Sequence, residues 1–63
     1  MNFKKGDYVS IYNPSDPEHN GQRGFIKSEK GLDSYLVTLE NGDIISIKRN
    51  HLRKDNPYYK NGF

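Results

Sequence analysis

Two short stretches near the start of the chain decide the fold: Gly6-Asp7-Tyr8-Val9-Ser10-Ile11 and Gly21-Gln22-Arg23-Gly24-Phe25-Ile26. Alternation over 7–12 puts Val9 and Ile11 on one face of a strand and the tyrosines on the other. Turn-forming residues without an apolar side chain fill 13–21, which predicts a long exposed loop. A second strand is predicted over 23–28. We assign Gly21 and Gly24 to a positive φ or a close approach of strands rather than to a ligand.

A hairpin is predicted from the strand 34–39 and the turn signal Asn41-Gly42. A two-residue turn would bury Ser46, whereas a three-residue loop over 40–42 pairs Val37 with Ile45 and keeps the apolar residues together. A slip of one residue moves every side chain to the other face of a strand. We therefore predict the three-residue loop, with Gly42 as a left-handed bulge.

The end of the predicted sheet is a single short turn followed by a brief strand. Asn50 is expected to cap the turn that carries Leu52 into the core, and Arg53-Lys54 to form the closing strand. We divide the chain into a domain over 1–55 and a frayed or loosely docked tail over 56–63. The predicted core consists of Phe3, Val9, Ile11, Ile26, Tyr35, Val37, Leu39, Ile45, Ile47 and Leu52. These elements indicate an all-β fold, a small and strongly bent antiparallel sheet.

Composition sets the class of protein. The 63 residues suffice for one domain, and the absence of cysteine excludes disulfides and thiolate metal sites. His19 and His51 lack a Cys or acidic partner at a ligand spacing, so we expect neither a metal site nor a cofactor. No apolar run approaches the length of a membrane span. Because no apolar segment follows Lys4 and Lys5, we expect no signal peptide. We expect a cytoplasmic protein without a membrane partner, either a monomer or a weak homodimer.

Catalytic motifs are missing from the sequence. It contains no nucleophile elbow, phosphate-binding loop, HExxH motif or useful acid pair. A net charge of +2 is too small to identify a nucleic-acid-binding protein by itself. We therefore predict a binding module rather than an enzyme.

The apolar and glycine pattern resembles a known family. Gly6-Asp7-x-Val9-x-Ile11, Gly21-x-x-Gly24-x-Ile26 and Tyr35-x-Val37-x-Leu39-x-Asn41-Gly42, with Leu52 near the end, resemble the SH3-like barrel of KOW-type domains. The resemblance covers residues 3–54. It implies a barrel of about five strongly bent antiparallel strands with a short 3-10 turn before the last one. Such domains occur in ribosomal proteins and transcription-elongation factors, where they contact RNA or neighbouring proteins.

Two kinds of partner fit the remaining residues. In the first, basic side chains neutralise the phosphates of RNA or DNA, and exposed tyrosines stack on unpaired bases. The candidates for phosphate contact are Lys48, Arg49, His51, Arg53 and Lys54, extended by Arg23, Lys27 and Lys30 if the second strand lies beside them; those for stacking are Tyr8, Tyr12, Tyr58 and Tyr59. In the second, the chain is a protein-interaction adaptor that uses Tyr8, Tyr12 and the 13–21 loop. The basic run could also be a solvated edge that prevents strands of different molecules from pairing.

Overall fold

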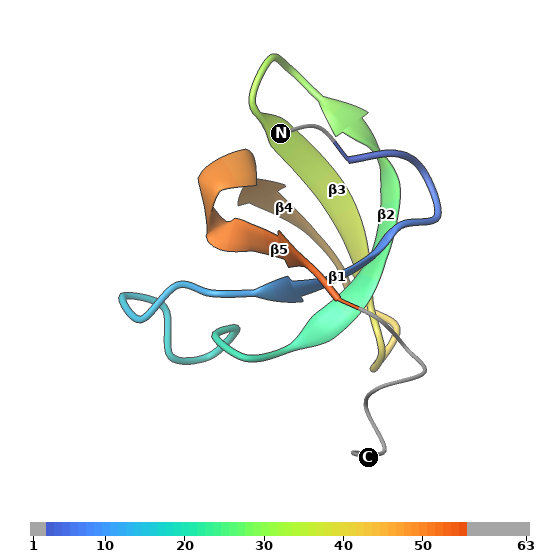
Figure 1. Ribbon diagram of the computed structural model, residues 1–63. Helices are drawn as coiled ribbons and strands as arrows, with labels where there is room; N and C mark the ends of the chain where they lie inside the picture. The colour runs from blue at the N-terminus through green and yellow to red at the C-terminus, as the bar shows by residue number, and fades with distance from the viewer. Residues whose placement is uncertain (1–2, 56–63) are drawn as a thin grey trace.

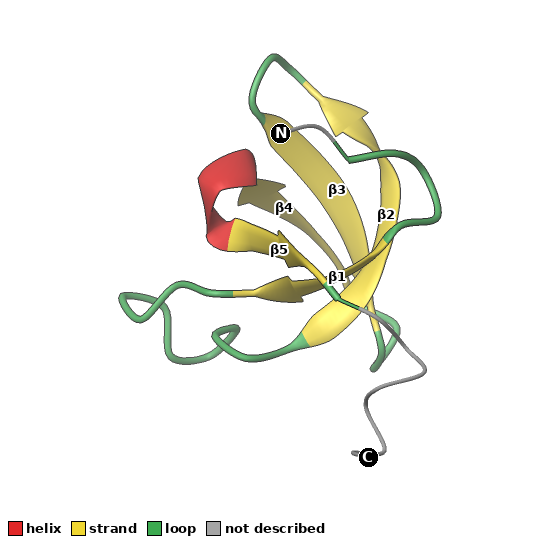
Figure 2. Ribbon diagram, in the orientation of Figure 1, coloured by secondary structure: helices red, strands yellow, loops and turns green. Residues whose placement is uncertain are grey.

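The strands of the described part of the chain form one sheet, which curls on itself (Figure 1). The structure, a computed structural model, describes residues 3–55. Its elements are β1 Tyr8–Ile11, β2 Arg23–Lys30, β3 Ser34–Leu39, β4 Ile44–Lys48, the 3-10 turn η1 Arg49–His51 and β5 Leu52–Lys54. All strand pairs are antiparallel and the order is β4-β3-β2-β1-β5. The all-β prediction is confirmed for these residues, and the sheet is open, with β4 and β5 at its edges (Figure 2).

The hairpin between β3 and β4 has the predicted register. Val37 pairs with Ile45 and Tyr35 with Ile47. Gly42 has a φ of 98°, a left-handed conformation that side chains rarely adopt. Its N–H donates to the Leu39 carbonyl (2.9 Å), and the Leu39 N–H donates to the Asp43 carbonyl (2.7 Å). The three-residue loop with a glycine bulge is therefore confirmed.

At Gly24, the backbones of β2 and β3 approach too closely for a side chain to fit between them. A Cβ atom on Gly24 would lie 2.2 Å from the carbonyl oxygen of Thr38, a backbone atom that cannot rotate away. Gly21, in contrast, has open space around it and a φ of 89°. The two glycines thus serve the scaffold in the two ways the sequence indicates.

The core lies on the concave face of the sheet. It consists of Phe3, Val9, Ile11, Ile26, Tyr35, Val37, Leu39, Ile47 and Leu52, with Ile45 packed against it but only partly buried. Phe3 covers one end: its ring meets Tyr35 edge-on at 5.5 Å, and its N–H donates to the Tyr35 hydroxyl (3.2 Å). The predicted core is thus confirmed for its other members, whereas Ile45 is only partly buried.

Tyr8 departs from its predicted role. It lies on the outer face of β1, as the alternation predicts, but it is only 6% exposed and so is not an open contact residue. Its ring packs against Phe25 with 4.9 Å between centroids, and its hydroxyl donates to the Glu40 carboxylate (2.6 Å). The hydrogen bond to Glu40, together with burial, raises the pKa of Tyr8 above its usual value. Tyr8 thus ties β1 to the hairpin loop.

Two further predictions concern the cap of η1 and the C-terminal tail. The capping role of Asn50 is wrong, because the N-cap of η1 is Lys48 and no side chain caps the turn. A backbone contact from the Arg49 N–H to the Asp33 carbonyl (2.7 Å) holds the start of η1 instead. The predicted tail over 56–63, including Tyr58 and Tyr59, lies outside the described residues. Within residues 3–55 no helix is long and apolar enough to cross a membrane.

Candidate functional site

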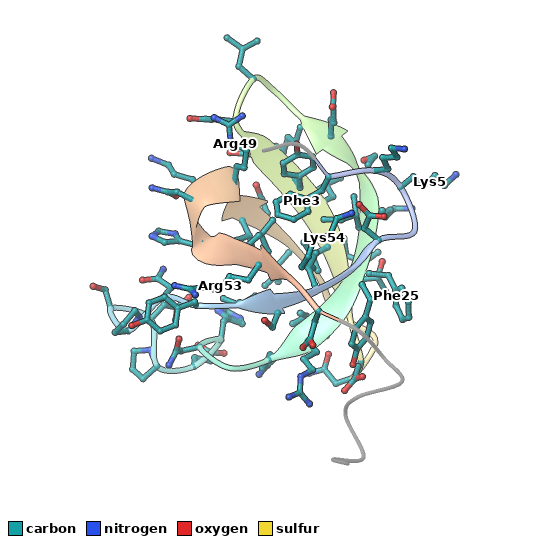
Figure 3. The ribbon with its side chains drawn as sticks, viewed as in Figure 1. Phe3, Lys5, Phe25, Arg49, Arg53 and Lys54 are labelled. Atoms are coloured by element: carbon teal, nitrogen blue, oxygen red, sulfur yellow. The ribbon has the colours of Figure 1, made fainter. Side chains whose placement is uncertain are left out.

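The basic run near the end of the chain is divided between the two faces of the sheet. On β5, Arg53 pairs with Ser10, whereas Lys54 pairs with the buried Val9. Successive strand residues point to opposite faces, so only Arg53 shares the outer face of β1. Lys54 turns the other way, and its ammonium lies 3.5 Å from the Asp7 carboxylate. Figure 3 shows Arg53 and Lys54 on opposite sides of β5.

A second arginine reaches the outer face from the opposite side of β1. Ser10 pairs with Arg53 on β5 and also with Arg23 on β2. Partners in a ladder share a face, and neighbouring strands lie about 5 Å apart, so the Cβ atoms of the two arginines are roughly 10 Å apart. Tyr12 lies two residues beyond Ser10 on the same face. We call Ser10, Tyr12, Arg23 and Arg53 the arginine surface.

Arg53 and Tyr12 form a stacked pair at one end of this surface. The guanidinium carbon of Arg53 lies 4.5 Å from the centroid of the Tyr12 ring, a cation–π arrangement. The backbone N–H of Tyr12 donates to the His51 carbonyl (2.8 Å), which fixes the ring beside the last strand. Tyr12 remains 51% exposed. An aromatic face and a planar cation are therefore presented together to solvent.

Arg23 is held at the other end by an acid. Its Nε donates to the Asp55 carboxylate (3.0 Å), while the side chain stays 44% exposed. A guanidinium carries five N–H donors, so one hydrogen bond leaves donors that can contact a further anion. Asp55 thus orients Arg23 and also partly neutralises it.

The other predicted cations lie elsewhere. Arg49 and His51 belong to η1, where His51 is half-buried, and Lys48 is exposed at the end of β4. Figure 3 shows Arg49 at the far end of η1 from Arg53. Lys27 is exposed on β2 at the irregularity between Ile26 and Ser28. The structure therefore brings Arg23, Arg53 and Tyr12 together and leaves the remaining cations on η1 and on other parts of the sheet.

The 13–21 loop contains a feature that sequence reasoning missed. His19 Nδ1 lies 2.8 Å from the Asp16 carboxylate, and ligand atoms of Asp16, Glu18 and His19 lie within 4.8 Å of one another. The expectation that His19 has no acidic partner is thus wrong. The hydrogen bond to Asp16 raises the pKa of His19. This contact, with backbone hydrogen bonds from His19 and Asn20 to the Asp16 carbonyl, stabilises a local turn.

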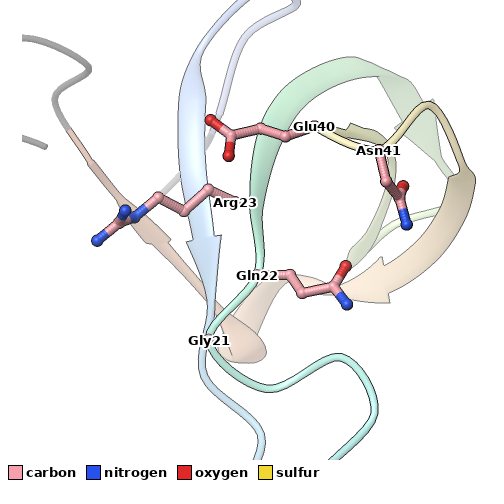
Figure 4. A pocket seen from close by; sticks show the side chains of 5 residues that line it. All are labelled: Gly21, Gln22, Arg23, Glu40 and Asn41. Carbon is pink, nitrogen blue, oxygen red and sulfur yellow. The ribbon is translucent and has the colours of Figure 1, made fainter.

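A small hollow of about 230 Å³ lies between the end of the loop and the hairpin (Figure 4). Its lining residues are Gly21, Gln22, Arg23, Glu40 and Asn41. Figure 4 shows the Arg23 side chain extending away from those of Gln22 and Asn41. The hollow is smaller than a typical ligand pocket, and its polar groups do not converge on one point.

An apolar row on the outer face is the second surface that the register creates. Tyr8 pairs with Phe25, Phe25 with Thr38, and Thr38 with Ile44, across four neighbouring strands. Phe25 is 45% and Ile44 52% exposed. Alternation alone places each residue outward, but only the pairing of strands joins them into a row.

Comparisons with protein-family models, with curated proteins and with solved structures each found no match to this chain. The function of the arginine surface therefore has to be inferred from its own residues and geometry.

Proposed function

We propose that the chain is a small, non-catalytic binding module of the SH3-like, KOW-type class that contacts RNA or DNA through the arginine surface. The strand order, the curl of the sheet and the 3-10 turn before β5 support this class. Binding rather than catalysis is supported by the exposure of Tyr12 and Arg53 on the outer face of the sheet.

The observation that carries the proposal is the exposed Arg53–Tyr12 pair, with Arg23 across Ser10. Guanidinium groups donate charge-assisted hydrogen bonds to phosphate oxygens, often in pairs. A tyrosine ring or a guanidinium plane stacks on an unpaired base whatever its sequence. Phosphate contact and base stacking are thus available within one short surface, which favours single-stranded over duplex nucleic acid.

The adaptor hypothesis keeps one supporting observation. The apolar row through Phe25 and Ile44 is exposed, as a protein-binding surface would be. Burial of Tyr8 removes that residue from the contact surface that the sequence suggests for an adaptor. An adaptor would therefore use Phe25 and Ile44 of the apolar row, with Tyr12 as the exposed tyrosine, rather than Tyr8.

An NMR titration of labelled protein with short single-stranded and duplex oligonucleotides at two salt concentrations tests the proposal. We expect single strands to shift the signals of Tyr12 and Arg53, with a log-log salt slope of about −1.4 to −2 for two or three phosphates. Arg53→Glu should weaken binding about tenfold or more. Lys30→Glu is the matched control: it makes the same charge change on an exposed residue outside the surface.

Two results would contradict the proposal. Equal weakening by Arg53→Glu and Lys30→Glu would mean diffuse attraction rather than a site. Undetectable binding of every oligonucleotide at low salt would remove nucleic acid as the partner, and a protein partner captured through Phe25 would then favour the adaptor.

A further inference from the structure

The edge of β4 that faces away from β3 is unpaired within residues 3–55. The sequence of β4 is also suited to pairing with an antiparallel copy of itself. In the sheet over residues 3–55, β4 pairs only with β3, and no strand lies on its other side. Unpaired edges offer N–H and C=O groups to another strand unless charges, proline or a covering element block them. β4 reads Ile44-Ile45-Ser46-Ile47-Lys48, without proline and with a charge only at its end.

The direction of the backbone groups follows from the contacts with β3. The Asp43 carbonyl accepts from Leu39 (2.7 Å), and the Arg49 N–H donates to Asp33 (2.7 Å), so odd-numbered residues turn toward β3. Backbone groups alternate along an antiparallel strand. The N–H and C=O groups of Ile44, Ser46 and Lys48 therefore point to the open edge.

We propose that β4 pairs with β4 of a second copy of this chain, antiparallel and centred on Ser46. In this register Ser46 faces Ser46, and Ile44 faces Lys48 of the second copy. All three residues have outward backbone groups, so each facing pair exchanges two hydrogen bonds as antiparallel ladders require. The two five-stranded sheets would join into one continuous sheet. This inference goes beyond the proposed function and does not depend on it.

Side chains on both faces of the sheet favour a second copy of β4, in this register, over an unrelated strand as the partner. On the outer face, the aliphatic stem of Lys48 would cover Ile44, which is 52% exposed in the single chain. On the inner face, the half-buried Ile45 would meet Ile47 of the second copy. The charges at the two ends of β4 are complementary as well. Asp43 precedes the strand, and the basic residues Lys48 and Arg49 lie at its end. In the antiparallel dimer, Asp43 of one copy lies near the basic end of the other.

The contact would be small, since each strand offers five residues. Interfaces of low area give weak and reversible association. We therefore expect a monomer–dimer equilibrium that shifts with protein concentration. Such an equilibrium would double the number of arginine surfaces in one particle.

Sedimentation equilibrium of the full chain, without nucleic acid, from about 10 µM to about 1 mM tests the proposal; this range covers the weak affinities expected of a small contact. We expect association in the wild type. Ile44→Lys should weaken the dimer about tenfold. In this variant an ammonium group faces that of Lys48 of the second copy, and by symmetry the contact occurs twice. Ile44→Lys combined with Lys48→Glu should restore the dimer, because opposite charges then face each other.

A second variant tests the backbone contact directly. Ser46→Pro removes an N–H that points to the open edge and makes no ladder bond with β3, so the monomer should still fold while dimerisation is lost. Ser46→Ala keeps the N–H and should dimerise like the wild type. Amide NMR spectra confirm the fold of each variant.

The proposal fails if the wild type remains monomeric at about 1 mM, near the weak limit of specific association. It also fails if Ile44→Lys leaves association unchanged, or if Lys48→Glu does not restore it in the Ile44→Lys background. Loss of oligonucleotide binding in Arg53→Glu has no bearing on these measurements, so this inference and the proposed function can fail separately.

Discussion

His19 shows how a single contact in an exposed loop can carry a pH dependence. Its Nδ1 donates to the Asp16 carboxylate, and this bond raises the pKa of His19 in the folded chain. A raised folded pKa means that the folded state holds the proton more tightly than the unfolded state. The stabilising contribution is therefore complete below the ordinary histidine value of about 6.5 and is lost as pH rises through the higher folded value.

We predict that an NMR titration of the His19 ring gives a pKa above the ordinary histidine value. Asp16→Asn keeps a hydrogen-bond acceptor but removes the charge, so it should lower this pKa. Glu18→Gln is the control, because Asp16 makes the direct contact and Glu18 contributes only a weaker electrostatic effect. An unchanged titration in Asp16→Asn would mean that the contact in the loop does not persist in solution.

At the scale of elements, the decisive feature is the close approach of the β2 and β3 backbones at Gly24. Gly24 pairs with Leu39 on β3 and with Val9 on β1, so the residue lies between two strands at the centre of the sheet. The atoms nearest to an added Cβ belong to the backbone of Thr38 and Leu39. The strand pair itself would have to separate to admit even a methyl group.

Gly24→Ala is expected to lower the free energy of unfolding by about 1–3 kcal/mol, the usual cost of overpacking a core. This is a large share of the stability of so small a domain. Urea unfolding followed by circular dichroism measures the loss. Ser28→Ala, on an exposed part of the same strand, should change stability by less than about 0.5 kcal/mol. Equal stability of the two variants would mean that β2 and β3 lie farther apart than the structure places them.

The presence of most strands was predictable from the sequence. The pairing of strands was predictable only for the β3–β4 hairpin, whose two strands are joined by a short loop. Alternation identified the strand over Ser34–Leu39 with its observed bounds, and the apolar residues on both sides of Asn41-Gly42 decided the hairpin register. The capping of η1 was not predictable in this way. Its start is held by a carbonyl of Asp33, which no local pattern connects to Arg49.

For the whole molecule, the sheet order predicts where the fold opens first. β2 lies between β1 and β3, whereas β5 has three residues and, within the described part of the chain, pairs only with β1. Local opening is easiest where few contacts must break. Amide hydrogen exchange should therefore be slowest in the middle of the sheet and fastest beside β5.

The amides of Ile26 and Asp55 provide a direct comparison. Each donates to a carbonyl on the β1 side, Ile26 to Asp7 and Asp55 to Tyr8, at the same distance of 2.9 Å. We expect Ile26 to exchange about a hundredfold more slowly, because its opening requires the core to separate. Equal protection after correction for intrinsic rates would show that the sheet opens as one unit, without separate fraying of β5.

The candidate site was predictable as a list of residues but not as a surface. Arg53, Arg23 and Tyr12 were among the candidates, but so were cations that the fold sends elsewhere, such as Lys54 against Asp7. Tyr8 was assigned to the exposed surface, although Phe25 and Glu40 cover it. Exposure of an outward residue depends on its cross-strand neighbours, which the sequence pattern of one strand does not contain.

The sequence by itself determined which residues face the core, where the strands run and how the β3–β4 hairpin is paired. These properties depend on side-chain alternation and on one short loop, so they are encoded within a few residues. Only the tertiary structure decided that β5 returns to β1 and places Arg53, Ser10 and Arg23 in one row. That pairing joins segments far apart in the chain, and burial of the shared core, rather than any local preference, brings them together.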